Sequence, residues 1–246
     1  MEWSPKVARR VGVSTLGLAL ALLCGACQTA PPSTPASPLP SSPAAASTPV
    51  EKGSTLVAFG DSLTEGLGVD PDKAYPAQLE KKLRVEGMNW TVVNAGLSGE
   101  TSSGARSRLD WVLKLEPDAV ILETGGNDGL RGIDPKVTRE NIGALIDELQ
   151  KRDIPVMLAG MKTLSNLGPD YTGPFESLYP DLAREKAVPL IPFFLEGVAG
   201  SVELNQDDRI HPTERGYTLI VERLTPTVLP WLKGLPAAKA TPTPTP

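Results

Sequence analysis

Histidine and cysteine are scarce in this 246-residue chain, and their scarcity limits the chemistry that it can carry. Both cysteines, Cys24 and Cys27, lie close to the N-terminus, so the rest of the chain has neither a disulfide framework nor a cysteine-based metal site. His211 is the only histidine, which excludes a histidine-rich zinc site. Any reaction that needs an imidazole must therefore use this one side chain.

Basic residues are also too few to favour a nucleic-acid partner. The chain carries 24 Lys and Arg against 29 Asp and Glu, a formal net charge of −5. A nucleic-acid-binding domain normally carries an excess of basic residues on one face, so no nucleic-acid partner is expected. The hydrophobic content of 40% is enough for one good-sized core, or for two small domains at most.

Residues 1–26 have the layout of a secretory signal peptide. Three basic residues precede an apolar run, residues 11–24, that is too short to span a bilayer well. Two small residues directly before Cys27 look like the cleavage site of a bacterial lipoprotein. This pattern predicts an exported protein that is anchored to a membrane through a lipid on Cys27. The alternative is ordinary cleavage after Ala26 or Ala30, which would release a secreted protein.

Two further stretches lack the composition of a folded core. No charged residue occurs from Gln28 to Val50, where Pro, Ser, Thr and Ala dominate. This composition predicts an extended tether over residues 27–53. Residues 235–246 end in TPTPTP and predict a second disordered segment. The globular domain is therefore expected over residues 54–234.

Strand-like and helix-like segments alternate through this domain. The alternation predicts a three-layer α/β/α sandwich around a five-stranded parallel sheet. Residues 105–113 share an apolar stripe with helical spacing, Pro174 has the character of a first-turn proline, and Thr213 is a candidate start for the last helix. The apolar runs expected to form buried parallel strands are residues 55–60, 90–96, 119–126, 154–160 and 188–194.

Polar residues follow several of these strands, at the carboxyl edge where parallel sheets bind ligands. Ser62 follows the first strand, a glycine-rich turn follows the second, Asn127 follows the third, and His211 follows the last. A nucleophilic serine needs a base, a group that orients the base, and donors for the developing oxyanion. His211 is the only available imidazole, and Asp208 precedes it by three residues, close enough to reach the ring. Asp207 is the competing candidate for the orienting role.

Each of these residues also has a purely structural interpretation. Ser62 and Glu65 have the spacing of a helix capping box, in which the serine hydroxyl would bind backbone N–H groups. A lone histidine is usually structural, and Asn127 lies in a sequence that is typical of a turn. Asp61, Glu65 and Glu123 are expected to hold local backbone rather than take part in chemistry.

Four stretches, FGDSLTEG, LSGETSSG, GGND and DDRIHP, resemble in this order the conserved blocks of the SGNH, or GDSL, hydrolases. The resemblance covers nearly the whole predicted domain and implies a flavodoxin-like fold. It implies Ser62 as the nucleophile, His211 as base and then acid, and Asp208 as the residue that orients His211. The N–H groups of Ser62 and Gly99 and the side chain of Asn127 would form the oxyanion hole. Gly99 could instead simply relieve a tight turn.

The sequences GGNDGLRG and residues 179–199 look like the small bacterial arylesterase and thioesterase/lysophospholipase branch of this family. The resemblance implies a serine esterase that acts on esters or thioesters with short to medium acyl chains, on aryl esters and on lysophospholipids. We expect a monomer that requires no metal or organic cofactor. Residues 161–174 stand where this branch lines its acyl site. Two alternatives are a carbohydrate O-deacetylase and a non-catalytic, tethered binding lipoprotein.

Overall fold

The computed structural model describes residues 53–163 and 165–236. The expected signal peptide, the lipid anchor at Cys27 and nearly all of the tether lie outside the described residues, as does most of the expected C-terminal tail. Among the described residues, no helix is both long and apolar enough to cross a membrane.

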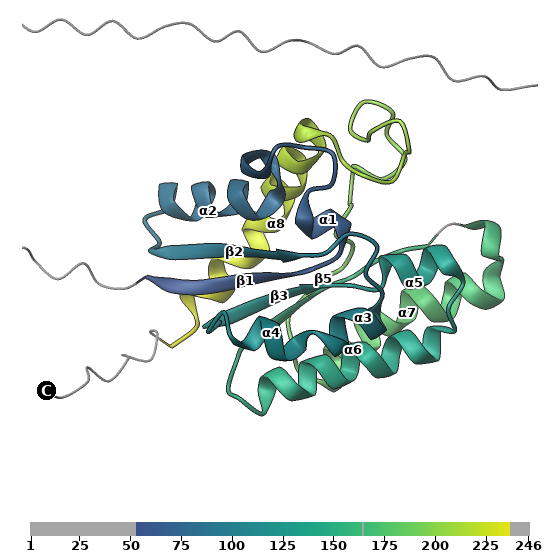
Figure 1. The fold of residues 1–246 in the computed structure, drawn as a ribbon, viewed down its shortest axis with the longest axis horizontal. Coiled ribbons are helices and arrows are strands. Elements are labelled where there is room, and N and C mark those ends of the chain that lie inside the picture. Colours follow the sequence, from purple (N-terminus) through teal and green to yellow (C-terminus); the bar gives the residue numbers. More distant parts are fainter. Residues whose placement is uncertain (1–52, 164, 237–246) are drawn as a thin grey trace, which may run out of the picture. The chain divides into compact units, whose positions relative to one another are not determined.

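The described residues form a five-stranded, fully parallel sheet, as the alternating pattern predicts (Figure 1). The strand order β2-β1-β3-β4-β5 is the flavodoxin-like, doubly wound order. Gly60 pairs with Gly96 and with Glu123, so the carboxyl ends of β1, β2 and β3 are aligned at one edge. The strands are β1 (Ser54–Gly60), β2 (Trp90–Gly96), β3 (Ala119–Glu123), β4 (Val156–Ala159) and β5 (Leu190–Ile191).

Three strands are shorter than the apolar runs that predict them. β3 stops at Glu123 rather than at residue 126, because Gly125 takes a left-handed φ of 100° that turns the chain into the next helix. β5 is confined to two residues because Pro189 and Pro192 flank it, and proline has no N–H to donate to a sheet.

Helices cover both faces of the sheet and complete the three layers (Figure 1). The helices α2 (Tyr75–Val85) and α8 (Glu214–Lys233) pack together on one face. The other face is covered by α3 (Ser102–Ser107), α4 (Leu109–Leu113), α6 (Pro135–Gln150) and α7 (Pro169–Glu185). The remaining short elements are α1 (Ser62–Glu65), α5 (Gly126–Arg131) and two 3₁₀ turns, Pro71–Lys73 and Ser165–Leu167.

The helix signals in the sequence are correct in part. Thr213 caps α8, since its side chain accepts a hydrogen bond from the N–H of Gly216. The stripe over residues 105–113 is divided at Arg108 into α3 and α4, because Arg108 leaves the helical conformation. Pro174 is not a first-turn proline: it lies inside α7, whose first residue is Pro169, and its ring costs the helix one backbone hydrogen bond.

Candidate active site

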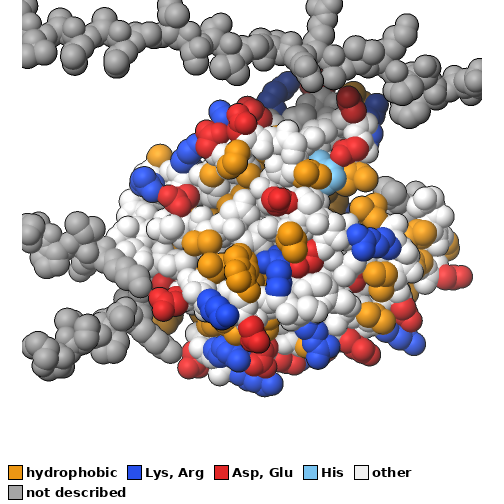
Figure 2. All heavy atoms as spheres, viewed as in Figure 1, with side chains coloured by type: hydrophobic (Ala, Val, Ile, Leu, Met, Phe, Trp, Pro, Cys, Tyr) orange, Lys and Arg blue, Asp and Glu red, His pale blue; other side chains and the backbone are white. Residues whose placement is uncertain are grey.

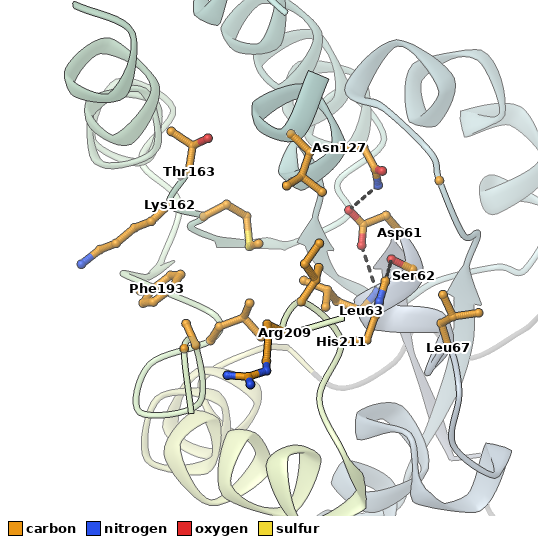
Figure 3. Close-up of a pocket in the computed structure, with 18 of the residues that line it drawn as sticks. Asp61, Ser62, Leu63, Leu67, Asn127, Lys162, Thr163, Phe193, Arg209 and His211 are labelled. Atoms are coloured by element: carbon orange, nitrogen blue, oxygen red, sulfur yellow. Dashed lines mark hydrogen bonds between the residues drawn. The ribbon is translucent and has the colours of Figure 1, made fainter. Parts of the chain in front are cut away.

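Ser62 is the first residue of α1, directly beyond the end of β1 (Figure 3). The residue that caps this helix is Asp61, whose Oδ1 accepts a hydrogen bond of 2.9 Å from the N–H of Leu63. The capping-box interpretation of Ser62 and Glu65 is therefore wrong. Since Asp61 caps the helix, the hydroxyl of Ser62 is left for another partner.

That partner is His211, whose Nε2 lies 2.8 Å from Ser62 Oγ. The Nδ1 of the same ring lies 2.6 Å from Asp208 Oδ2. A carboxylate can only accept hydrogen bonds, so Nδ1 donates to Asp208 and carries the proton of the neutral ring. Nε2 is then an acceptor, and the hydroxyl of Ser62 donates to it. The structure thus joins three residues from two distant segments in one line of hydrogen bonds.

Asp207 and Asp208 are both exposed, but Asp208 is the one that contacts the ring. The other carboxylate oxygen of Asp208, Oδ1, accepts hydrogen bonds from the N–H groups of Ile210 (2.9 Å) and His211 (3.0 Å). Partial burial raises the pKa of Asp208, but the hydrogen bonds from His211 and Ile210 outweigh it and lower the pKa to about 2. Asp208 is therefore ionised at neutral pH and holds the tautomer described above.

Gly99 lies in the turn after β2, with a left-handed φ of 75° that a residue with a side chain adopts only under strain. Two charged residues hold this turn. Glu65, the last residue of α1, accepts hydrogen bonds from both the N–H and the hydroxyl of Ser98. Arg131, the last residue of α5, donates a hydrogen bond of 2.8 Å to the carbonyl oxygen of Gly99. The turn is thus fixed to the helices that carry Ser62 and Asn127.

Asn127 lies in the first turn of α5, so it belongs to a helix rather than to the turn that its sequence suggests. Its Nδ2 donates a hydrogen bond of 3.1 Å to Asp61 Oδ2. The next residue, Asp128, is fully buried and accepts hydrogen bonds from Ser102 and Thr138. Because these partners belong to α3 and α6, Asp128 fixes the position of the short helix that presents Asn127.

A second buried carboxyl group, that of Glu123, lies beneath α1. Its Oε2 accepts a hydrogen bond of 2.8 Å from Thr64 and a longer one, 3.4 Å, from the N–H of Asp61. Burial raises the pKa of Glu123 well above its ordinary value, and the negative charge of Asp61 raises it further. Burial also raises the pKa of Asp61, to about 6, although hydrogen bonds from Leu63 and Asn127 act in the opposite direction.

A cavity of about 690 Å³ opens over these groups (Figure 3). Ser62, Gly99, Asn127 and His211 all line it, whereas Asp208 lies behind the ring of His211 and does not. Residues 161–163 of the segment expected to line an acyl site lie in its wall. The apolar part of the wall is formed by Leu63, Leu67, Leu130, Met161, Phe193, Leu195, Ala199 and Ile210.

This arrangement has the main parts that acyl transfer needs: a hydroxyl bonded to an imidazole, a carboxylate behind the imidazole, and the amide of Asn127 at the same cavity. Over residues 53–163 and 165–236, no group of three or more His, Cys, Asp or Glu side chains could hold a metal ion. The sequence provides the local pair Asp208 and His211. It gives no sign that Asp61 contacts Asn127 or that Glu65 and Arg131 hold the Gly99 turn, because these partners are distant along the chain.

Comparison with known proteins supports the same chemistry. The sequence model of the GDSL-like lipase/acylhydrolase family matches residues 58–219. The chain is 38% identical over 179 residues to the esterase TesA of Pseudomonas aeruginosa, an alignment that covers 72% of this chain and 89% of TesA. It is 37% identical over 169 residues to thioesterase 1/protease 1/lysophospholipase L1 of Escherichia coli K12, covering 68% and 80% of the two chains.

A solved structure shows that the similarity extends from the sequence to the fold. The crystal structure of AlinE4, described as an SGNH-hydrolase family esterase, superposes with a TM-score of 0.62 at 42% identity. The superposition covers 75% of this chain and 98% of AlinE4. The shared region therefore takes in almost all of that solved esterase chain.

Proposed function

Because this chain belongs to the GDSL-like lipase/acylhydrolase family, we propose that it is a serine esterase that hydrolyses carboxylic esters and thioesters through an acyl-enzyme on Ser62. The observation that carries this proposal is the line of hydrogen bonds from Asp208 through His211 to Ser62 at the wall of an apolar cavity. The N–H groups of Ser62 and Gly99 and the amide of Asn127 are the proposed oxyanion donors.

In the acylation step, Ser62 Oγ attacks the acyl carbonyl carbon while its proton passes to His211 Nε2. The electron pair of the carbonyl π bond moves to the oxygen, which the oxyanion donors stabilise. The tetrahedral intermediate then collapses, the bond to the leaving oxygen or sulfur breaks, and His211 returns its proton to that atom. Asp208, ionised because its pKa is about 2, stabilises the imidazolium that exists between these events.

In the deacylation step, a water molecule takes the place of the serine hydroxyl. His211 accepts a proton from the water, whose oxygen attacks the acyl-enzyme carbonyl. Collapse of the second tetrahedral intermediate breaks the bond to Ser62 Oγ, which recovers its proton from His211. The carboxylic acid leaves and the free enzyme is restored. The reaction thus consumes one ester and one water, and it requires no metal or organic cofactor.

The cavity supports substrates with an apolar acyl or aryl group. Its volume of about 690 Å³ lies within the range of small-molecule sites, about 300–1,000 Å³. Although polar and apolar side chains both line it, most of the surface that its wall exposes is apolar, which favours short to medium acyl chains and aryl groups. The proposed substrates are such esters and thioesters, together with lysophospholipids. The carbohydrate O-deacetylase alternative has no comparable support, because the named relatives are esterases and a thioesterase/lysophospholipase.

Substitution of the nucleophile tests this proposal. We expect Ser62→Ala to lower kcat on p-nitrophenyl esters by several orders of magnitude, because no other group is placed to attack. Ser107→Ala is the matched control, since Ser107 is an exposed residue at the end of α3 whose hydroxyl bonds only to its own helix. Turnover by Ser62→Ala at the wild-type rate would overturn the proposal. Absence of labelling by a fluorophosphonate probe would instead support the non-catalytic alternative.

We further propose that the protein is exported and held at a membrane by a lipid on Cys27, and that it acts as a monomer. The signal and cleavage pattern before Cys27 supports the first point. The second is supported by the line of hydrogen bonds from Asp208 to Ser62, which needs no residue of a second copy. Membrane fractionation of Cys27→Ser tests the anchor: release from the membrane is expected. A variant that stays membrane-bound and unprocessed would contradict lipidation.

A further inference from the structure

Asn127 can serve as an oxyanion donor only if its amide presents nitrogen, not oxygen, to the cavity. The two ends of an asparagine amide have nearly the same shape, so packing alone does not choose between them. A hydrogen-bond partner that accepts but cannot donate makes the choice. Asp61 Oδ2 lies 3.1 Å from Asn127 Nδ2 and is such a partner (Figure 3).

Asp61 is itself held in one orientation. Its side chain is buried, and its Oδ1 is occupied by the N–H of Leu63 at 2.9 Å. The backbone of α5 packs against Oδ2 at Gly126, where a Cβ atom would lie only 3.2 Å from this oxygen. The carboxylate therefore has one oxygen directed to the helix that carries Ser62 and the other directed to Asn127.

We propose that Asp61 is a positioning residue for the hydrolysis: it holds the Asn127 amide so that the second N–H of Nδ2 faces the oxyanion. The inference deepens the proposed function and rests on it. Oxyanion donors act through their fixed position, because no reorganisation is then needed as charge develops on the substrate oxygen. Asp61 makes Asn127 such a fixed donor without contacting the substrate oxygen itself.

Asp61→Asn separates this role from helix capping. The Leu63 N–H requires an acceptor, so the oxygen of the new amide remains at the cap, where asparagine is as good a capping residue as aspartate. The NH₂ group of the new side chain must then face the NH₂ group of Asn127. The variant thus keeps the cap and removes the acceptor that orients Asn127.

A double-mutant cycle tests the proposal in the full chain with a p-nitrophenyl ester. We expect Asn127→Ala to lower kcat by about 10²–10³-fold, as loss of one oxyanion donor does, and Asp61→Asn to lower it by about 10²-fold with KM little changed. The central expectation is that adding Asp61→Asn to Asn127→Ala lowers kcat no further. Asp134→Asn, which alters the similarly capped but exposed start of α6, should leave kcat unchanged.

The cycle distinguishes this role from an electrostatic effect on His211. If Asp61 acted through its charge alone, Asp61→Asn would slow the Asn127→Ala enzyme as much as it slows the wild type. Losses that multiply in this way, or a wild-type kcat for Asp61→Asn, would overturn the proposal. Asp61→Ser, a capping residue too short to reach Asn127, gives the same cycle if Asp61→Asn does not fold. A fully active Ser62→Ala would instead reject the proposed function itself.

Discussion

His211 Nε2 lies 2.8 Å from Ser62 Oγ, although 149 positions separate the two residues in the chain. The contact forms at the carboxyl edge of the sheet, where β1 ends and where the segment before α8 returns. Asp208 reaches the same ring from only three positions away. The sheet therefore brings Ser62 to His211, whereas a local turn brings Asp208 to it.

The first prediction concerns the carboxylate behind His211. We expect Asp208→Asn to lower kcat by about 10⁴-fold, because an amide in this position no longer holds the proton on Nδ1. The adjacent Asp207→Asn is the matched control and should be as active as the wild type, since Asp207 is exposed and only Asp208 contacts the ring. Steady-state kinetics on a p-nitrophenyl ester measures both. Equal losses in the two variants would refute the assignment of Asp208.

The second prediction concerns the pH dependence of stability. Burial raises the pKa of Asp61 from 3.8 to about 6, so the folded state binds this proton more tightly than the unfolded chain. The stabilisation is fully present below pH 3.8 and is lost as pH rises through about 6. Asp61→Asn has no such titration. We therefore expect its free energy of unfolding, relative to the wild type, to increase by up to about 3 kcal/mol between acidic and neutral pH.

Urea denaturation of Asp61→Asn and the wild type at about pH 4 and about pH 7 measures this change. Asp134→Asn is the control, because Asp134 caps α6 in the same way from an exposed position. A difference between Asp61→Asn and the wild type that stays constant with pH would show that Asp61 is not protonated preferentially in the folded state.

The third prediction concerns a partly buried ion pair that supports the site. Arg108 donates hydrogen bonds to Glu100, to the carbonyl oxygens of Gly60 and Ala95, and its guanidinium lies over the ring of Phe59. Because Glu100 is almost fully buried, Arg108→Ala leaves it without a counter-charge. We expect the free energy of unfolding to fall by about 3–5 kcal/mol.

The exposed Arg84, which pairs with Glu80 on α2, provides the comparison for that variant. Its replacement by alanine should cost at most about 1 kcal/mol, as is usual for surface ion pairs. Chemical denaturation gives both values. A loss for Arg108→Ala no larger than that for Arg84→Ala would mean that the Glu100 carboxylate is solvated after all.

The fourth prediction concerns chain-length preference. Figure 3 shows Phe193 across the cavity from Ser62, where the far end of an acyl chain would lie. We expect Phe193→Ala to shift the preferred ester towards longer chains. The value of kcat/KM should rise about 4-fold for each additional methylene that the enlarged cavity buries. Val85→Ala, at a residue that is 80% exposed on α2, should leave the profile unchanged. An unaltered profile for Phe193→Ala would show that this ring does not limit chain length.

Much of the fold and of the site can be predicted from the sequence, because it depends on local patterns or on a residue type that occurs only once. The continuous apolar runs predict parallel strands buried on both faces, and their alternation with helical stripes predicts the layers. With a single histidine in the chain, an imidazole base can only be His211. The turn that joins Asp208 to it spans three residues, so their contact follows from sequence spacing.

The role of Ser62 needed the tertiary structure. Its spacing from Glu65 matches a capping box, and propensity alone cannot reject that interpretation. In the fold, Asp61 takes the cap and Glu65 turns to Ser98 in the loop after β2. The Asp61 cap is local, but the contact between Glu65 and Ser98 depends on β1 and β2 being neighbours in register, which no local pattern encodes.

The sequence by itself determined which side chains are available for the chemistry: a serine directly after the first strand, one histidine, and an aspartate within reach of it. Only the tertiary structure decided how they are held. Asp61 meets Asn127 because β1 and β3 are adjacent strands whose carboxyl ends are aligned, and Arg131 meets Gly99 across the same edge. Contacts between distant segments arise from strand order and register, and these are set by the packing of the whole domain.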